Sequence, residues 1–397
     1  MHSNLPLKHL FDLPEGVIYL DGNSLGPLPR AVPDRLNQMV RDEWAGKLIR
    51  GWNDAGWMEQ PRRVGDMVGA LIGAAKGSVM MGDTLSIKVY QGLAAGLAMR
   101  PDRRVILSDN GNFPTDLYMA KGLIELLDRG YELRLVDPAD IKGAINEDVA
   151  VVMLTQVGYG TGRTHEMASI TKAAHRAGAV MLWDLAHSAG ALPVDIAGSN
   201  AEIAVGCTYK YLNGGPGAPA FIYVRPDLIE TIQPALSGWL GHDAPFAFDL
   251  DYRPAHSIDR MRVGTPPVLQ LTALETALEV WSGLDMKEVR ARSIQLSELF
   301  IEEVETRCPT LKLNSPRDPE NRGSQVSFAF PHGYAAMRAL IDRGVIGDFR
   351  APDVMRFGIT PLYLDEDDII RAAEILEKII REDLWQEPKY QIRSAVT

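Results

Sequence analysis

Residues 149–154 read Val-Ala-Val-Val-Met-Leu, an apolar run without one polar side chain. A strand that is apolar on both faces is typical of a mostly parallel sheet covered by helices. Around this run, between about residues 64 and 224, short β-rich runs alternate with helical periodicity. The predicted strands are residues 104–107, 132–136, 150–157, 179–183, 203–208 and 220–224, separated by helices such as 87–99, 116–128 and 167–177. The sequence therefore predicts an α/β domain.

The flanking segments follow other patterns. The first fifty residues read as an irregular arm and then a helix over 31–49, and residues 241–267 as a long loop or linker. Beyond the loop we expect helices at 268–281, 288–306, 334–343 and 367–381, a strand at 324–330, and an extended, irregular stretch at 345–358. We therefore predict an arm (1–50) packing with the small domain, a large domain (51–262) and a smaller α+β domain (263–397).

Composition narrows the class of protein. A chain of 397 residues is long for a single core, so two domains are expected. The net charge of −11 argues against non-specific nucleic-acid binding. No run reaches the roughly 18 apolar residues of a membrane span. Asp12 and Glu15 interrupt the N-terminal stretch, so we expect no signal peptide. Two cysteines indicate no disulfide framework and fit the cytoplasm, and no HExxH-like pair indicates a catalytic metal.

Polar residues gather where predicted strands end, which is where open α/β sheets bind ligands. Asp184 and His187 follow one strand, Lys210 follows the next, and Phe113 precedes a helix start. A lysine and a carboxylate together suit pyridoxal phosphate, which needs an amine to form a Schiff base and an acid for its ring nitrogen. An aromatic ring such as Phe113 could stack on the cofactor. Residues 83–86, which open a helix, could hold its phosphate through backbone N–H groups.

Each of these residues also has an ordinary structural interpretation. A lysine after a strand is usually solvated, and an aspartate there usually caps a helix. Residues 22–26 match the nucleophile-elbow pattern GxSxG, but Pro27 and Pro29 follow and prevent a helix from starting at once. Residues 214–217 are glycine-rich but lack the ending of a phosphate loop. Arg356, in an apolar stretch, is either a structural ion-pair partner or a receptor for a carboxylate.

Six segments taken together resemble the kynureninase family of fold-type-I pyridoxal-phosphate enzymes, over nearly the whole chain. The segments are LDGNSLG (20–26), FPTD (113–116), WDLAH (183–187), YKYLN (209–213), GWLGH (238–242) and RVGTPP (262–267). The resemblance implies hydrolysis of L-kynurenine to anthranilate and L-alanine in tryptophan catabolism, on the kynurenine pathway that also serves NAD biosynthesis. It implies 3-hydroxykynurenine as a second candidate substrate, although Thr265, where animal members carry Asn, favours L-kynurenine.

The resemblance also implies a site. Lys210 would carry the cofactor and move protons, Asp184 would pair with the ring nitrogen, and Tyr209 would be a general acid. The cofactor contacts would be Leu85, Ser86, Phe113, Pro114, Thr115, Asp116, Thr155, Asp184, His187, Tyr209, Lys210, Trp239 and Thr265. Arg356 would bind the substrate carboxylate, with Ser24 beside the substrate. Family members are homodimers, so Trp239 and Thr265 are expected to reach the partner's site.

Two other functions stay open at this point. A cysteine desulfurase or selenocysteine lyase has the same fold type, but it needs a nucleophilic cysteine on a mobile loop and typically stacks a histidine on the cofactor. Here Cys207 and Cys308 sit in regular elements or just after them, and the stacking position is Phe113. A non-catalytic kynurenine-binding homologue is the second alternative, although every catalytic type of residue is present.

Overall fold

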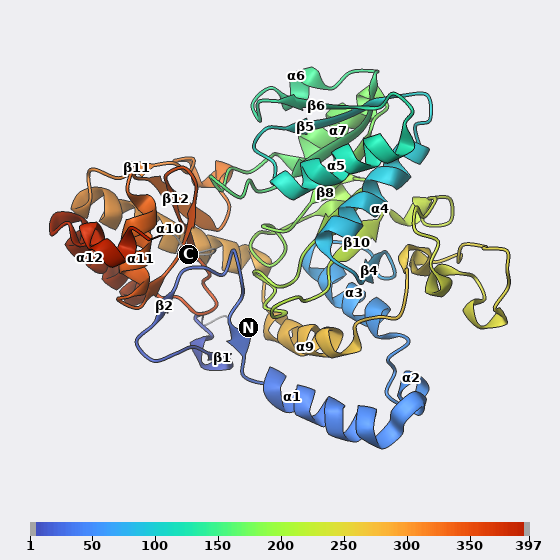
Figure 1. The fold of residues 1–397 in the computed structure, drawn as a ribbon, viewed down its shortest axis with the longest axis horizontal. Helices are drawn as coiled ribbons and strands as arrows, with labels where there is room; N and C mark the ends of the chain where they lie inside the picture. Colours follow the sequence, from blue (N-terminus) through green and yellow to red (C-terminus); the bar gives the residue numbers. More distant parts are fainter. Residues whose placement is uncertain (1–4, 393–397) are drawn as a thin grey trace.

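The computed structural model describes residues 5–392; the chain ends that belong to the predicted first and third segments, 1–4 and 393–397, lie outside the described residues. The chain forms two lobes, a larger one to the right and a smaller one to the left in Figure 1. The larger lobe is built on a seven-stranded sheet and the smaller lobe on a four-stranded sheet. Among residues 5–392, no helix has the length and apolar character to cross a bilayer.

The large sheet has the strand order β4-β10-β9-β8-β7-β5-β6. Its strands are β4 (Val79–Met81), β5 (Val105–Asp109), β6 (Glu132–Val136), β7 (Val149–Thr155), β8 (Val180–Asp184), β9 (Ile203–Gly206) and β10 (Phe221–Val224). Strand β10 runs antiparallel to its two neighbours, β4 and β9, and the other four pairs are parallel, so the predicted mostly parallel sheet is confirmed. Strand β4 was not predicted, because three residues are too few to show a period.

Helices cover both faces of this sheet and create two cores. Along β8, Met181 and Trp183 lie in one core, while Val180 and Leu182 lie in the other. This alternation explains why the strands are apolar on both faces. The helices of this lobe are α3 (Gln60–Leu71), α4 (Leu85–Ala98), α5 (Pro114–Leu127), α6 (Ile141–Ala144), α7 (Met167–Ala177), α8 (Ile196–Ser199) and α9 (Val268–Leu278). Gly96 lets α4 lie close to the sheet, since a Cβ there would stand 2.8 Å from Val151.

The N-terminal segment connects the lobes. Strand β1 (Phe11–Asp12) pairs with β3 (Leu28–Pro29), and β2 (Ile18–Tyr19) pairs in parallel with β13 (Val345–Ile346) of the small lobe. Helix α1 (Val32–Gln38) continues as a wider π-helical turn to Ala45, and α2 (Gly51–Asp54) follows. Helix α1 packs on α9. The predicted single helix over 31–49 is therefore present but irregular.

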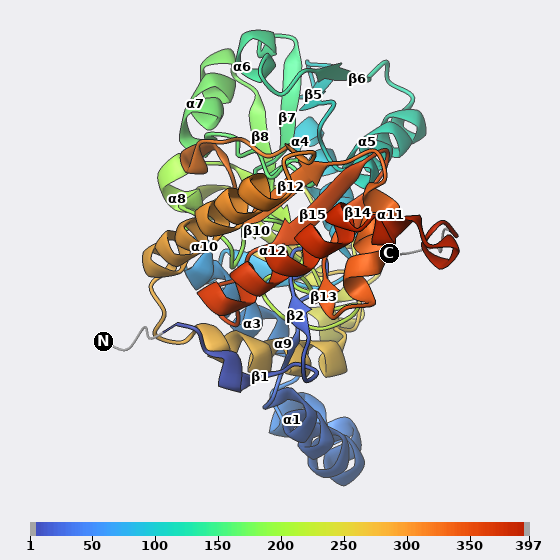
Figure 2. The same cartoon turned by 90° about the vertical axis from the view of Figure 1, so that its left-hand side faces the viewer.

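The small lobe pairs a sheet with long helices. Its sheet has the order β11-β12-β15-β14, from β11 (Lys312–Leu313), β12 (Gln325–Ala329), β14 (Asp348–Arg350) and β15 (Val354–Gly358), and all pairs are antiparallel. Helices α10 (Met286–Arg307), α11 (Gly333–Ile341) and α12 (Glu366–Arg381) cover it, and α10 lies alongside α12 in Figure 2. The stretch 345–358, expected to be extended and irregular, forms three of the strands.

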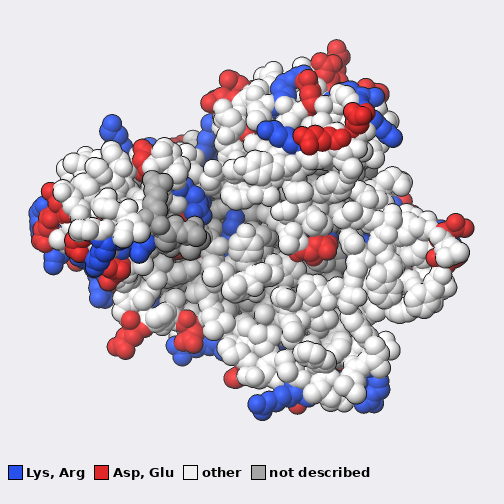
Figure 3. All heavy atoms as spheres, in the orientation of Figure 1, with Lys and Arg blue, Asp and Glu red and all other residues white. Residues whose placement is uncertain are grey.

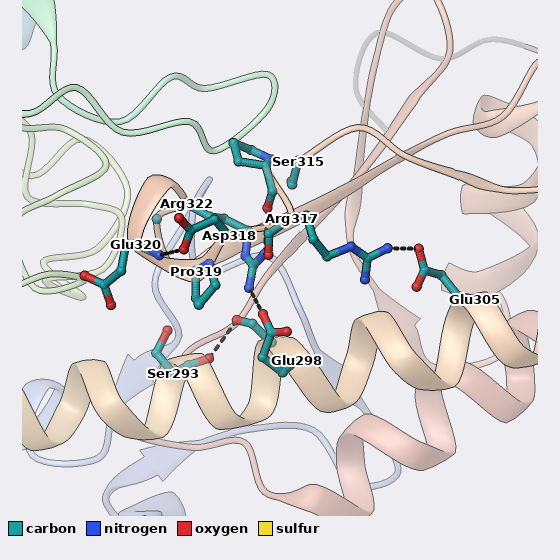
Figure 4. A network of polar contacts seen from close by, with 12 residues as sticks. Ser293, Glu298, Glu305, Ser315, Arg317, Asp318, Pro319, Glu320 and Arg322 are labelled. Atoms are coloured by element: carbon teal, nitrogen blue, oxygen red, sulfur yellow. Dashed lines mark hydrogen bonds and ion pairs between the residues drawn. The ribbon is translucent and has the colours of Figure 1, made fainter.

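A buried arginine fastens the turn before β12 to α10. The side chain of Arg322 is 1% exposed; it donates to the carbonyls of Pro316 and Arg317 and pairs with Glu298 on α10 (Figure 4). Arg317 pairs with Glu305, about two turns further along the same helix. Because Arg322 leads directly into β12, this network fixes the start of the central strand of the small sheet.

Candidate active site

The carboxyl ends of the central strands place the predicted polar residues side by side. Asp184 ends β8 and Thr155 ends β7, and the two residues are Cα partners in the register of this parallel pair. Lys210 lies four residues after β9, and its Nζ is 3.0 Å from Nε2 of His187. The structure therefore brings together the lysine, the carboxylate and the histidine that the sequence singled out.

Two buried carboxylates, those of Asp184 and Asp116, lie at this edge of the sheet. Asp184 accepts hydrogen bonds from the Ala186 backbone N–H (2.8 Å) and from Thr155 Oγ1 (3.3 Å). Asp116 is 1% exposed, and its Oδ2 has no hydrogen-bond partner among the described residues. Burial and the charge of Asp184 raise the pKa of Asp116 well above its usual range. Burial also raises the pKa of Asp184, against the opposing charge of Lys210. Such a pair attracts a cationic group.

The lysine stands among aromatic rings. Lys210 Nζ lies 6.0 Å from the centroid of Phe113 and 5.7 Å from that of Tyr209. The rings of Phe113 and Tyr159 meet edge to face, with centroids 5.2 Å apart, and the Phe113 side chain is 39% exposed. Burial and the charge of Lys210 lower the pKa of His187 well below its usual range, so its imidazole is neutral. Its Nδ1 has no partner among the described residues.

Two helices that carry predicted cofactor contacts begin with backbone N–H groups that are free within the described part of the chain. Helix α4 begins at Leu85 and Ser86 after the extended Thr84. Helix α5 begins after Phe113 at Pro114, which has no backbone N–H, so its first donor is Thr115. The first N–H groups of a helix have no partner within it, so they suit an anion such as phosphate. Burial raises the pKa of Tyr209, so its phenol is protonated at neutral pH. The lowering that a general acid would need does not come from the surrounding protein groups.

Arg356 is both an ion-pair partner and a neighbour of Ser24. Its Nε donates to Asp348 Oδ1 (2.7 Å), its Nη1 to the Tyr159 carbonyl (2.7 Å) and its Nη2 to Ser24 Oγ (3.0 Å), and Nη2 also pairs with Asp348 Oδ2. Ser24 Oγ in turn donates to Asp348 (2.7 Å). A guanidinium has five N–H groups, so four are engaged and one has no partner among the described residues. Arg356 thus makes a structural ion pair, and a substrate carboxylate would have to join this network.

The last two predicted cofactor contacts, Trp239 and Thr265, lie on segments that come after the strands of the large sheet. Trp239 is 43% exposed, stands edge to face with Phe246, and follows Gly238. Gly238 crosses Val263 so closely that a Cβ would lie 1.9 Å from the Val263 carbonyl oxygen. The segments that carry Trp239 and Thr265 are thus packed together. Within residues 5–392, no hydrogen bond joins either side chain to the Lys210 cluster.

Sequence reasoning missed several members of the site. Asn112 accepts from Thr155 Oγ1 (2.5 Å) and donates to Ser108 (3.0 Å), so it braces the rim from one residue before Phe113. Asp348 and the Tyr159 carbonyl hold Arg356. A polar residue just before a predicted helix start was a usable signal for Asn112. Nothing local marks Tyr159, whose backbone makes the contact.

Pyridoxal phosphate fits these residues on the structure itself. An unpartnered buried carboxylate oxygen, an amine over an aromatic ring and free helical N–H groups are complementary to a cationic ring nitrogen, an aldehyde and a phosphate. By contrast, no group of three or more His, Cys, Asp or Glu side chains in the described part of the chain is arranged to hold a metal ion.

Comparisons with solved structures show the fold. A cysteine desulfurase from Thermococcus onnurineus NA1 superposes with a TM-score of 0.82 at 17% identity, covering 96% of this chain and 99% of that one. A C-DES variant with glycine covalently linked to its PLP cofactor gives 0.77 at 18% identity, covering 93% and 98%. The architecture is thus that of fold-type-I PLP enzymes, as predicted.

Comparisons of sequence show the family. A family model described as the kynureninase C-terminal domain matches residues 289–376. Kynureninase from Burkholderia pseudomallei (strain 1106a) is 51% identical over 399 residues, which cover 99% of this chain and 96% of the relative. Kynureninase from Pseudomonas fluorescens is 49% identical over 402 residues, covering 100% and 97%. This chain therefore belongs to the kynureninase family.

Proposed function

We propose that this chain is a PLP-dependent hydrolase that cleaves the Cβ–Cγ bond of L-kynurenine to give anthranilate and L-alanine. The observation that carries the proposal is the meeting of the Lys210 amine with the buried Asp184–Asp116 pair on one rim, in a chain 51% identical to a kynureninase over nearly its whole length. Hydrolysis adds water across the broken bond. The oxygen goes to the carbonyl carbon and forms the carboxylate of anthranilate, and a proton goes to Cβ and forms the methyl group of alanine.

When bound, pyridoxal phosphate supplies a protonated ring that stabilises negative charge on the substrate carbon beside the amino group. Asp184, fixed by Ala186 and Thr155, would hold the ring nitrogen, and the buried Asp116 would lie close to this pair. Phe113 would stack on the ring, and Leu85, Ser86 and Tyr209 would hold the phosphate. Pro114 and Thr115 would complete this wall of the site at the start of α5.

The chain's own residues would then handle protons and charge. Lys210 would remove the proton from the substrate carbon that carries the amino group and later deliver it to another atom. The neutral His187, whose Nε2 is 3.0 Å from Lys210 Nζ, would keep the amine in place. Tyr209, the residue before Lys210, is protonated at neutral pH and would donate a proton in the reaction. Arg356 and Ser24 would receive the substrate carboxylate by opening one or more of their present hydrogen bonds.

The proposed partner is a second copy of the chain. A groove of about 740 Å³ lies between the N-terminal arm, α1 and α9, and its lining is mostly apolar. Nearby side chains are also exposed: Trp44 (55%), Leu48 (65%) and Ile49 (77%), and, on the arm that carries Trp239, Phe248 (75%). Figure 3 shows few charged side chains over α9, whereas they gather on the small lobe and at the top of the large lobe. Exposed apolar surface of this kind favours an isologous dimer in which Trp239 and Thr265 complete the partner's site.

The dimer can be tested by mixing inactive subunits. Lys210→Ala and Trp239→Ala homodimers are each expected to be impaired, whereas a mixed dimer contains one site with both native residues. Recovery of part of the activity on mixing supports the shared site, and sedimentation measures the dimer itself. A monomeric, fully active chain would contradict the proposal.

We further propose that the arm (1–50), the large domain (51–262) and the small domain (263–397) are the working parts of the enzyme, with α9 of the third part packed on α3 of the large lobe. We also propose that the enzyme works in the cytoplasm in tryptophan breakdown. Pairing of β2 with β13 supports the assignment of the arm to the small domain. The cysteines support a reducing compartment, since both are buried and unpaired. Their burial also argues against a desulfurase: Cys308 is 1% exposed, and burial raises its pKa to about 11.

The deciding experiment is a turnover assay. Purified protein with pyridoxal phosphate and L-kynurenine should produce fluorescent anthranilate and an equal amount of alanine. 3-Hydroxykynurenine, assayed in parallel, should be the poorer substrate. A chain that binds kynurenine without turnover would be the non-catalytic homologue, and persulfide formed from L-cysteine would identify a desulfurase.

A further inference from the structure

The side chain of Lys88 is completely buried in the first turn of α4. An ammonium removed from water costs several kcal/mol unless its charge and its N–H groups are all compensated. The first turn of a helix makes the position worse, because the helix dipole presents its positive end there. The groups that hold Lys88 must therefore be specific.

Three acceptors surround the ammonium, two of them just before or on α4 and one far along the chain. Its Nζ is 3.0 Å from Asp83 Oδ2, 2.9 Å from Gln91 Oε1 and 3.4 Å from the Met261 carbonyl oxygen. An ammonium has three N–H groups, so each one has an acceptor. Gln91 is also fully buried, and its Nε2 donates to the same Met261 carbonyl (3.3 Å). Lys88 and Gln91 thus fasten Met261 to α4.

The fastened segments lead to the two halves of the proposed phosphate site. Asp83, in the left-handed region with φ 58°, is followed by Thr84 and by the free N–H groups that open α4. Met261 leads into residues 262–265, which end at Thr265. A narrow crevice is lined on one side by Gly82 and Asp83 and on the other by residues 262–267. Lys88 lies behind this crevice and fixes its two walls.

We propose that Lys88 is a positioning residue for the cofactor phosphate, because it holds the start of α4 and the 261–265 segment in one arrangement. The inference rests on the proposed cofactor-binding function. In the proposed dimer the same ammonium serves two sites: its own through Leu85 and Ser86, and the partner's through Thr265 and the Trp239 segment packed against it.

The test separates phosphate binding from binding of the rest of the cofactor. The full-length apoprotein is titrated with pyridoxal 5'-phosphate and with pyridoxal, which lacks the phosphate, and binding is followed by absorbance. Lys88→Met is expected to weaken binding of the phosphorylated compound about tenfold or more, equivalent to about 1.4 kcal/mol. Binding of pyridoxal should stay within about twofold of wild type.

Two further variants control for charge and for folding. Gln91→Met removes the hydrogen bonds to Lys88 and Met261 without changing any charge, and should weaken only the phosphorylated compound, by several-fold. It also carries the test alone should Lys88→Met not fold. Val89→Ala, on the same helix and fully buried, should lower the melting temperature and leave the ratio of the two affinities unchanged.

The outcomes are distinguishable. Unchanged affinity for pyridoxal 5'-phosphate in both Lys88→Met and Gln91→Met would overturn the inference. Equal losses for both compounds would also overturn it, because they would show a general effect on folding. A wild-type chain that binds neither compound would instead defeat the proposed cofactor function.

Discussion

Two polar clusters of the molecule differ in how completely their hydrogen-bonding groups are paired. At the rim of the large sheet, Asp116 Oδ2 and His187 Nδ1 are buried without partners among residues 5–392. In the small lobe, four of the five N–H groups of Arg356 are already engaged by Asp348, Tyr159 and Ser24. Unsatisfied buried groups are costly, so the first cluster is completed only by a molecule that enters it. The second cluster is paired without a ligand, so a substrate carboxylate, as proposed, would have to exchange with its hydrogen bonds.

Removal of Lys210 should break the first cluster most severely. Lys210→Ala is expected to reduce anthranilate formation at least about a thousandfold, because no other amine stands over Phe113 among the contacts of the site. Lys210→Arg is the matched control, since it keeps the positive charge without the nucleophilic amine, and should be as inactive. Borohydride-resistant, colourless protein should accompany both losses. Turnover of Lys210→Arg within about tenfold of wild type would refute the assignment.

The two carboxylates of the rim should not be equivalent. Asp184→Asn keeps the shape and the contact with Thr155 but removes the charge, and is expected to lower kcat about a hundredfold and to weaken cofactor binding. Asp116→Asn should cost less, because burial and Asp184 already favour its protonated form. Steady-state kinetics at saturating cofactor compares them. A larger loss in Asp116→Asn would reverse the two assignments.

The second cluster should affect binding more than turnover. Arg356→Ala is expected to raise KM for L-kynurenine about a hundredfold, the effect of losing roughly 3 kcal/mol of a buried charged interaction, with a smaller change in kcat. Arg350→Ala is the control: Arg350 pairs with the same Asp348, at 2.8 Å, but is 40% exposed, and should have a smaller effect. An unchanged KM in Arg356→Ala would leave that residue a purely structural role.

The smallest effect concerns pH and Asp21, which lies beside Asp348. Burial, and then the charge of Asp348, raise the pKa of Asp21 from 3.8 to about 7. A carboxyl whose folded pKa is raised binds its proton more tightly in the folded state, so stability falls as pH rises from about 4 through about 7. Asp21→Asn, an uncharged mimic of the protonated form, should therefore melt a few degrees higher than wild type at pH 8. The difference should shrink toward pH 4. A difference independent of pH would show that Asp21 does not titrate there.

The sequence predicted most of the large lobe because both faces of its sheet are buried. Apolar strands such as 149–154 have no other stable environment, and parallel strand ends converge by topology, which brought Asp184 and Lys210 together. The strands of residues 345–358 were less predictable. β13 and β14 have only two and three residues, and the partner of β13 is β2, near the opposite end of the chain.

Within the site, the chemical type of a side chain was easier to predict than the contacts it makes with distant residues and backbone groups. The combination of residue types at predicted strand ends and at a helix start indicated Lys210, Asp184 and Phe113, because together they suit one cofactor. The state of Arg356 depended on Asp348 and on the Tyr159 carbonyl, neither of which its own neighbours in sequence reveal. Burial of Lys88 was hidden for the same reason, since its acceptor at residue 261 lies far along the chain.

The pairing of β2 with β13 has a consequence for protein engineering. Leu20 exchanges backbone hydrogen bonds with Ile346 and Gly358, and Ser24 binds Asp348, whereas Gly26 donates to the Tyr209 carbonyl. Residues 20–26 thus connect the two lobes: Leu20 and Ser24 bind the small lobe, and Gly26 binds the large lobe. A shortened version that begins after residue 24 would keep Lys210 and Asp184, yet lack the Ser24 hydroxyl that we propose binds the substrate carboxylate together with Arg356. Expression fragments and circular permutants should therefore keep residues 18–26 joined to β2's partner strand and to the body of the large sheet.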